Sequence, residues 1–354
     1  MRIAIDISQI VYGTGVSIYT KELIKSLLSI DQENEYTLFG GAFRRRQEIL
    51  ESFPTSRVFP IPPAIADIVW NKLHVLPIEK LIGSVDVLHT SDWTEPPSKA
   101  FKVTTVHDLY PLKFPKMVHP KVLEAHRGRL YWVKKESKRI IVPSLSTKND
   151  LISLGFREEA IRVIPEAPTL KKASEEKIAE VKKKYQIRED YLMSIGITPL
   201  KNTKRIIKAF HLATPGKDLK LIIAGRPANL KIEPERNVRL VGHIPQSDLE
   251  ALLTGARGLI FASLYEGYGI PILDGFNCEV PVITSNIGSM PEVAGGAAEL
   301  VDPNSVNSIA EGIAKVVRGG KGLVEKGNIR IKDFSWEKTA KMTLDVYNEA
   351  KNYK

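Results

Sequence analysis

Short apolar runs rich in β-branched residues alternate with helical patterns along the whole chain, and this alternation constrains the fold more than any other feature. In the first half, the runs predicted to be strands are Arg2–Ile7, Tyr36–Phe39, Val58–Ile61, Val85–His89, Lys102–His107, Arg139–Val142 and Ile161–Ile164. In the second half they are Tyr191–Ile195, Leu219–Ala224, Val238–Leu240, Gly258–Ala262, Pro281–Thr284 and Ala298–Val301. Helical patterns lie between several of them, for example over Ser17–Leu28 and Pro120–Glu136. The alternation predicts an α/β fold with parallel sheets and helices on both faces.

The length of the chain and one break in its pattern predict two domains. A chain of 354 residues is long enough for about two domains of ordinary size. Pro165-Glu166-Ala167-Pro168 interrupts regular structure, and a polar Lys- and Glu-rich segment follows it as far as Lys184. We therefore predict a doubly wound N-terminal domain over residues 1–168 and a second doubly wound domain over residues 169–335.

Local signals predict where three helices of the second half begin. Asn202 is placed to cap a helix that carries Ile206 and Phe210 on its apolar face. Ser247 and Glu250 have the spacing of a capping box. The turn Asp302–Ser305 precedes a helical pattern over Val306–Val317.

Composition excludes several classes of protein. The chain is 43% hydrophobic and 26% charged, as is usual for a folded globular protein. Cys278 is its single cysteine, so an internal disulfide framework is impossible. The apolar stretch at the N-terminus is too short for a signal peptide and is interrupted by Asp6, and no apolar run is long enough to span a bilayer. We expect a cytoplasmic protein.

The net charge of +10 leaves two interpretations open. The basic residues are spread along the chain without an aromatic-interleaved stripe, so nucleic acid is not expected as a partner. The charge is either a solvated surface or an attraction to an anionic membrane at the inner face of the cell.

Two basic segments carry the membrane hypothesis. Arg44-Arg45-Arg46 stands beside Phe43 and Phe53, and the run Arg127–Lys135 interleaves cations with Leu130, Trp132 and Val133. An interfacial helix would arrange its residues in this way. The alternative is that Leu130 and Val133 face the core and the cations are simply solvated.

A glycine turn follows the first predicted strand. Gly13-Thr14-Gly15 precedes a helix, and the backbone amides of such a turn favour a bound anion, although a plain tight turn is the alternative. A dinucleotide fingerprint needs a third glycine where this chain has Ile18, and an acid near Phe39-Gly40-Gly41. NAD is therefore not expected as a ligand.

Two further candidate sites lie at the ends of predicted strands, where ligands of open α/β sheets bind. His107 and Asp108 follow one strand, and the histidine could hydrogen-bond a sugar hydroxyl unless the pair merely organises the loop. Lys201 follows another strand beside a helix start, where it could meet a phosphate or be an ordinary loop lysine.

The strongest constellation is Glu266-Gly267-Tyr268-Gly269-Ile270-Pro271-Ile272-Leu273-Asp274. Two glycines let the backbone approach a ligand, and Pro271 suits the first turn of a helix. Asp274 lies about one turn further on, where its carboxylate could accept hydrogen bonds from two ribose hydroxyls. Free helix-end amides could hold a diphosphate. The alternative is a structural turn with a capping carboxylate.

Several other chemistries lack their motifs. The sequence has no D-x-D pair, no Walker A sequence, no C-x-x-C, no H-E-x-x-H and no G-x-S-x-G. We therefore expect neither a metal ion nor a cofactor.

The segment from Glu266 to Asp274 resembles the signature of family 4 glycosyltransferases, which is a Glu, then G-F-G-L-P, then a second Glu after seven residues. Other segments continue the resemblance in the same order along nearly the whole chain. They are Gly13–Gly15, Val106–Leu109, Pro199–Asn202, Val280–Ser285, Gly288–Val293 and Phe334–Trp336.

The resemblance implies a GT-B fold, in which two Rossmann-like domains face a central cleft. It implies that the N-terminal domain binds the acceptor and the second domain binds the donor, and that a C-terminal helix over residues 336–354 crosses back to the first domain. It also implies a retaining, metal-independent transfer of a hexose from a nucleotide diphosphate sugar to a glycan or lipid-linked acceptor.

The resemblance also implies roles for individual residues. Glu266 would contact the transferred sugar, and His107 would hydrogen-bond it near the reacting centre. The donor-binding residues would be Gly15, Lys201, Arg205, Tyr268, Gly269, Ile270 and Asp274. Asp274 replaces the usual second Glu, and Leu200 replaces an Arg that commonly precedes the phosphate-binding Lys, so Arg205 is expected to supply the missing cation.

The segment His107–Leu112, with Phe114-Pro115 after it, resembles bacterial mannosyltransferases that build surface polysaccharides, which favours GDP-mannose as the donor. A UDP-glucose-type donor is the second possibility. A non-catalytic sugar-nucleotide-binding protein and an epimerase on the same fold are rival functions.

Overall fold

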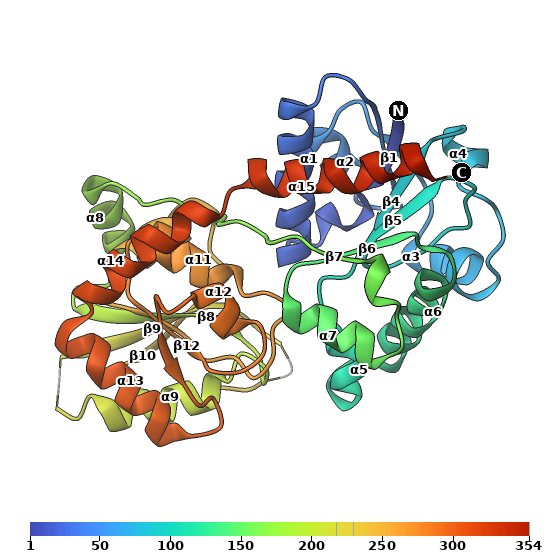
Figure 1. Ribbon diagram of the computed structural model, residues 1–354. Helices are drawn as coiled ribbons and strands as arrows, with labels where there is room; N and C mark the ends of the chain where they lie inside the picture. The colour runs from blue at the N-terminus through green and yellow to red at the C-terminus, as the bar shows by residue number, and fades with distance from the viewer. Residues whose placement is uncertain (217, 229, 354) are drawn as a thin grey trace. The chain divides into compact units, whose positions relative to one another are not determined.

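The computed structural model describes residues 1–216, 218–228 and 230–353, so Lys354 lies outside the described residues. The chain forms two compact units (Figure 1). The first consists of Met1–Glu166 together with the segment that begins at Ser335, and the second consists of Ala167–Phe334.

The first unit is built on a seven-stranded parallel sheet with the order β3-β2-β1-β4-β5-β6-β7. Its strands are β1 (Arg2–Asp6), β2 (Glu35–Gly41), β3 (Arg57–Phe59), β4 (Val87–Ser91), β5 (Phe101–Thr105), β6 (Arg139–Val142) and β7 (Ile161–Val163). Its α-helices are α1 (Gly15–Ile30), α2 (Arg46–Ser52), α3 (Pro63–Ala66), α4 (Glu79–Ile82), α5 (Tyr110–Lys113), α6 (Pro120–Glu136), α7 (Leu145–Ser153) and α15 (Trp336–Asn348). The 3₁₀ turns are η1 (Ser8–Val11), η3 (Pro115–Met117), η4 (Glu158–Ala160) and η6 (Glu349–Asn352), and η2 (Asp67–Lys72) is π-helical.

The second unit is built on a six-stranded parallel sheet with the order β10-β9-β8-β11-β12-β13. Its strands are β8 (Asp190–Ile197), β9 (Leu219–Pro227), β10 (Val238–Gly242), β11 (Leu259–Phe261), β12 (Val282–Ser285) and β13 (Glu299–Val301). Its helices are α8 (Glu175–Lys184), α9 (Thr203–Ala213), α10 (Gln246–Thr254), α11 (Ile270–Asn277), α12 (Met290–Ala294), α13 (Val306–Gly319), α14 (Lys321–Arg330) and the 3₁₀ turn η5 (Ile331–Asp333).

Most strands are buried on both faces of their sheet, whereas the edge strand β10 is largely exposed, and the buried strands are rich in apolar residues. In β1, Ile3 and Ile5 join the core that includes residues of α1 and α15, whereas Ala4 packs on the other face with Trp70. In β11, Leu259 and Phe261 lie in one core and Ile260 in another. Alternate side chains of a strand point to opposite faces, so strands buried on both faces favour apolar residues at every position. The polar side chains of the buried strands β4 and β5, such as His89, Lys102 and Thr104, are hydrogen-bonded. The prediction of two doubly wound Rossmann-like domains is confirmed.

Helix α15 packs against α1 and completes the core of the first unit (Figure 1). Ala340, Val346 and Tyr347 are buried in that core. The Tyr347 hydroxyl lies 2.6 Å from Nδ1 of the buried His89. The end of the chain is therefore an integral part of the first unit.

The three helix-start predictions had different outcomes. Ser305 caps α13 by accepting a hydrogen bond from the Ser308 amide, so that prediction is confirmed. The capping box at Ser247 is wrong, because α10 begins at Gln246 and its N-cap is Pro245, two residues before the predicted cap. Asn202 does occupy the N-cap of α9, but in a left-handed conformation and without capping it through its side chain.

Candidate functional site

Two of the predicted ligand-binding loops follow neighbouring strands of the second unit. Strands β8 and β11 are adjacent, and the strand order reverses between them. Ligands of open α/β sheets bind beyond the carboxyl ends of strands at such a reversal. The loop that carries Lys201 follows β8, and the loop that carries Glu266 follows β11. The Leu264 amide donates to the Leu200 carbonyl at 2.8 Å, which joins the two loops directly.

Lys201 and Glu266 form an ion pair at this position. The Lys201 Nζ lies 2.7 Å from the Glu266 Oε1, and the two side chains are 26% and 17% exposed. The ammonium also lies 4.5 Å from the centre of the Phe261 ring, so its position is defined from two sides. A cation and a carboxylate are thus held together, partly shielded from water, at the edge of the sheet where a ligand is expected.

The absence of a side chain at Gly196 leaves room for the Lys201 side chain. Gly196 adopts a φ of +91°, and a Cβ at that position would stand only 2.9 Å from the Cγ of Lys201. A side chain would therefore be strained by the backbone and would also displace the lysine.

Asn202 and Arg205 form a second contact beside the lysine. The Asn202 side-chain amide donates to the carbonyls of Ala262 and Pro303, at 3.0 and 2.6 Å. Its Oδ1 accepts a hydrogen bond from Arg205 Nη1 at 3.0 Å. Asn202 therefore fastens its loop to the segments that follow β11 and precede α13. Its Oδ1, the atom that would accept from a helix amide in a cap, accepts from Arg205 instead. Arg205 lies on the first turn of α9 within reach of the same edge.

The loop after Glu266 is shaped by Ser289. The Ser289 hydroxyl lies 3.0 Å from the Glu266 carbonyl and 2.6 Å from the Tyr268 carbonyl. Gly269 is the N-cap of α11 with a φ of +118°, which favours glycine. Tyr268 is buried, and Ile270 is the first residue of α11. The loop thus presents a helix N-terminus, whose dipole favours an anion, next to Glu266.

Asp274 is occupied by the backbone of its own unit. Its Oδ1 accepts hydrogen bonds from the amides of Thr169 and Leu170 at 2.6 and 2.9 Å. The residue is only 4% exposed, and burial raises the pKa of its carboxyl to about 7 against the opposing effect of these hydrogen bonds. A ribose would have to reach Oδ2 after a local rearrangement, so a capping role competes with the predicted one.

The predicted site residues of the first unit lie at the ends of β1 and β5. Gly15 is the first residue of α1, and the Thr14 amide before it donates to the Ser17 hydroxyl at 3.2 Å. An added Cβ at Gly13 or Gly15 would meet no described atom within 4 Å, so the turn faces open space. Asp108 accepts a hydrogen bond from the Tyr110 amide at 2.7 Å, so it organises its loop.

His107 is buried between polar and aromatic partners. Its Nδ1 lies 3.1 Å from Oε1 of Glu166, and its Nε2 lies 3.3 Å from the Ser91 hydroxyl. The Tyr19 ring meets it edge-on with a centroid distance of 4.5 Å. Burial alone would lower the pKa of His107, but the hydrogen bond and negative charge of Glu166 outweigh burial and raise it above the ordinary value.

Sequence reasoning missed two residues of these sites. Glu166 was interpreted only as part of a break between domains, because prolines flank it on both sides. Ser289 was noticed only as part of a family-like segment. Neither has a local signal for its role, since the partners lie 59 residues away for Glu166 and 21 and 23 residues away for Ser289.

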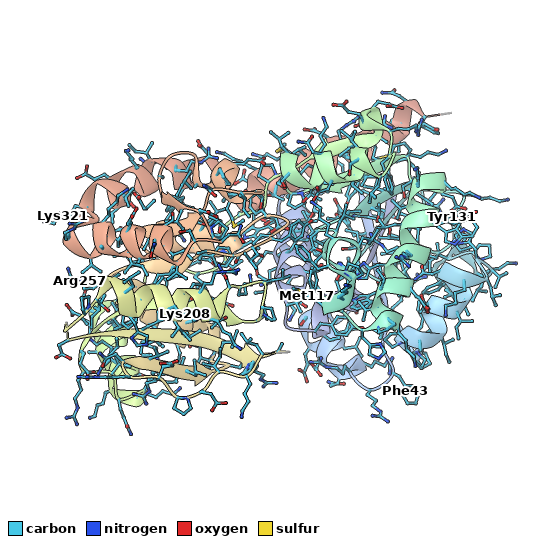
Figure 2. The ribbon with its side chains drawn as sticks, turned by 90° about the horizontal axis from the view of Figure 1, so that it is seen from below. Phe43, Met117, Tyr131, Lys208, Arg257 and Lys321 are labelled. Atoms are coloured by element: carbon cyan, nitrogen blue, oxygen red, sulfur yellow. The ribbon has the colours of Figure 1, made fainter. Side chains whose placement is uncertain are left out.

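Most of the apolar residues in the two basic segments are buried, which contradicts an interfacial helix over Arg127–Lys135, whereas peripheral contact of the protein with a membrane stays a prediction. Leu130 and Val133 belong to the core beneath α6, and Phe53 belongs to the core of α1. Trp132 stacks on His74 with a centroid distance of 3.5 Å. Phe43 is 64% exposed and Tyr131 is 51% exposed, and both lie at the surface of the first unit (Figure 2).

The described residues lack two features. No helix among them is both long and apolar enough to cross a bilayer. No group of three or more His, Cys, Asp or Glu side chains among them could hold a metal ion.

Comparisons with known proteins agree on one family. Residues 13–167 match the model of Glycosyltransferase Family 4, and residues 174–328 match that of Glycosyl transferases group 1. The O-antigen chain mannosyltransferase B of Escherichia coli is 28% identical over 94% of this chain and 96% of its own.

Solved structures share the fold at low sequence identity. The Anabaena protein HepE in complex with UDP and glucose superposes with a TM-score of 0.75, covering 99% of this chain and 100% of its own at 15% identity. The sucrose-phosphate synthase of Thermosynechococcus elongatus gives a TM-score of 0.77, full coverage of both chains and 15% identity.

Proposed function

The chain is a family 4 glycosyltransferase that resembles bacterial mannosyltransferases, and we propose that it moves mannose from GDP-mannose to a glycan or lipid-linked acceptor. In this proposal the transfer retains the anomeric configuration and requires neither metal nor cofactor. The protein would act in the cytoplasm, in peripheral contact with the inner face of the membrane.

The observation that carries the proposal is the ion pair between Lys201 and Glu266 at the strand reversal of the second unit. A nucleotide diphosphate would compete with Glu266 for the ammonium of Lys201. Once the diphosphate takes the lysine, the carboxylate is released toward the transferred sugar. Arg205 and the N-terminus of α11 would share the remaining negative charge.

The proposed chemistry follows from where charge develops. The bond between the anomeric carbon and the diphosphate oxygen breaks, which leaves a cationic sugar and an anionic leaving group. Lys201, Arg205 and the helix terminus stabilise the anion, and such stabilisation is usually the largest contribution to the rate. The acceptor hydroxyl attacks the same face of the sugar, and its proton passes to the leaving diphosphate oxygen. Glu266 stabilises the cationic sugar.

His107 would donate a hydrogen bond to the transferred sugar. Glu166 favours the protonated imidazole, which has N–H donors on both nitrogens. In the same proposal, the backbone amides of the turn at Gly15, the first residue of α1, would bind the donor diphosphate. Asp274 could reach the ribose only through Oδ2, since Oδ1 is held by two amides.

Mannose is favoured over glucose because a relative that matches along 94% of this chain is named as a mannosyltransferase. A UDP-glucose-type donor remains the second candidate. HepE, which was solved with UDP and glucose, supports it only through the shared fold.

The test is to incubate the protein with GDP-mannose or UDP-glucose and to follow release of the nucleoside diphosphate. We expect hydrolysis of GDP-mannose, and its strong loss in Glu266→Gln, which is nearly isosteric but removes the charge. Hydrolysis of neither donor would favour a non-catalytic nucleotide-sugar-binding protein. Isomerisation of the free donor without acceptor would indicate an epimerase.

A further inference from the structure

A solvent-open hollow of about 380 Å³ lies in the first unit, beyond the carboxyl ends of β1 and β2. Its walls are Val11, Tyr12, Gly41, Ala42, Pro62 and Pro63, with Phe43, Arg44 and Arg45 also lining it. The volume is that of an ordinary small-molecule site. The loops that carry Gly15 and His107 follow strands of the same sheet at the same edge.

The floor of the hollow is fixed by close backbone packing. A Cβ at Gly40 would lie 3.2 Å from the Ser8 amide nitrogen, and one at Gly41 would lie 3.2 Å from the Ile61 carbonyl oxygen. The Gly41 amide donates to the Ser8 hydroxyl at 2.9 Å, and that hydroxyl donates to Asp6 at 2.5 Å. The hollow is therefore built into the fold, because the two glycines let three segments converge.

The two charged side chains that line the hollow are those of Arg44 and Arg45. Arg45 pairs with Glu48 through its Nε and Nη2, at 2.7 and 2.6 Å, which partly neutralises it. Within the described parts of the chain, Arg44 has no such ion pair. An anion at the mouth would therefore meet Arg44 first.

An apolar surface continues from the proline wall of the hollow. Pro63 begins α3, and η2 follows it directly. Ile65, Ile68 and Leu73 are 51%, 47% and 63% exposed, whereas Ala66 and Trp70 on the opposite side are buried. The segment therefore exposes three large apolar side chains to solvent within nine residues, although Ala66 and Trp70 of the same segment are buried.

We propose that this hollow, which we call the arginine–proline pocket, binds the phosphate end of an amphiphilic acceptor, a phosphate ester whose apolar chain lies along Ile65, Ile68 and Leu73. A purely ionic ligand would leave the apolar walls unused, and a purely apolar one would leave Arg44 unused. This inference rests on the proposed glycosyl transfer, because it assigns the acceptor of that reaction to a lipid-linked class.

The test compares two neighbouring arginines. Arg44 lines the pocket, whereas Arg46 lies outside it as the first residue of α2. Citronellyl phosphate is titrated below its micelle concentration, and citronellol and inorganic phosphate are titrated in parallel. We expect citronellyl phosphate to bind more tightly than either comparison compound. Arg44→Gln should lower the affinity for citronellyl phosphate about tenfold, equivalent to about 1.4 kcal/mol. Arg46→Gln should change it less than twofold.

A second variant tests the apolar wall without endangering the fold. Phe43 is exposed (Figure 2), so Phe43→Ala should keep the melting temperature of the parent. It should lower the affinity for citronellyl phosphate and leave the affinity for inorganic phosphate unchanged. Equal effects of Arg44→Gln and Arg46→Gln would overturn the proposal. So would binding of anionic vesicles without binding of the monomeric amphiphile, since that would assign the surface to bulk lipid.

Donor hydrolysis is measured on the same preparations. Failure of citronellyl phosphate to bind a protein that still hydrolyses its donor overturns the pocket and leaves glycosyl transfer standing. Specific binding by a protein that hydrolyses no donor overturns the transfer reaction and leaves the pocket assigned.

Discussion

The buried pair of His107 and Glu166 gives the sharpest prediction for the proposed mechanism. Glu166→Gln keeps the shape of the side chain and its capacity to hydrogen-bond, but removes the negative charge 3.1 Å from Nδ1 of His107. An opposite charge at this range typically shifts a pKa by about 1–3 units, equivalent to about 1.4–4 kcal/mol. Without that charge, burial favours the neutral ring, and the pKa of His107 should fall by at least about one unit.

The sign of the effect is determined by the raised pKa. His107 stays protonated to a higher pH in the folded protein than in the unfolded chain. Its contribution to stability is therefore complete below the ordinary histidine pKa and is lost as the pH rises through the folded value. If the protonated ring assists transfer, kcat/KM should decline over the same interval, and in Glu166→Gln this decline should move to lower pH.

The assay is the pH profile of kcat/KM, together with an NMR titration of the seven histidines in which His107→Gln identifies the resonance. Glu159→Gln is the matched control, because Glu159 is exposed and pairs only loosely with Arg157 at 3.5 Å. An unchanged titration of His107 in Glu166→Gln would refute the electrostatic reasoning. A shifted titration with an unmoved activity profile would remove the imidazole from the mechanism.

Four further predictions concern the donor site, the core and the partners. Lys201→Ala should weaken binding of the nucleoside diphosphate more than binding of the nucleoside, by about 1.5–3 kcal/mol in calorimetry. Lys208→Ala on the exposed side of α9 (Figure 2) is the control, and a diphosphate affinity equal to the parent's in Lys201→Ala would assign diphosphate binding to Arg205. Asp274→Asn should flatten the pH dependence of the free energy of urea unfolding. Because the pKa of Asp274 is raised to about 7, its carboxyl binds more protons in the native state than in the unfolded state between pH 4 and 7, and wild-type stability should fall by up to about 4 kcal/mol over that interval. A variant profile as steep as the parent's would contradict this. Activity should survive EDTA, and full loss restored by Mg²⁺ or Mn²⁺ would refute transfer without a metal. The protein should co-sediment with anionic but not neutral liposomes at low salt; remaining in the supernatant with both would assign the +10 charge to the solvated surface.

Strand positions could be predicted because their cause is local. A strand buried on both faces must be apolar, and each predicted run overlaps an observed strand, as Arg139–Val142 does without any offset. The start of α13 was equally local, since Ser305 caps an amide three residues away.

The missed features depend on partners that are distant in the sequence. The amide of Asn202 is used by carbonyls 60 and 101 residues away, which no capping rule anticipates. The periodicity of α6 shows that Leu130 and Val133 share an environment, but it cannot distinguish a protein core from a lipid surface. The role of Glu166 could not be predicted either, because it meets His107 only once β5 and β7 lie in the same sheet.

The division of the chain bears on the order of events during synthesis. Residues 167–334 form one uninterrupted unit, whereas the first unit needs both Met1–Glu166 and the later segment that begins at Ser335. A ribosome therefore delivers every residue of the second unit before it delivers α15, whose Tyr347 is wholly buried against the first sheet. We expect the nascent first unit to expose the surface that α15 will cover until α15 has been synthesised and has left the ribosome.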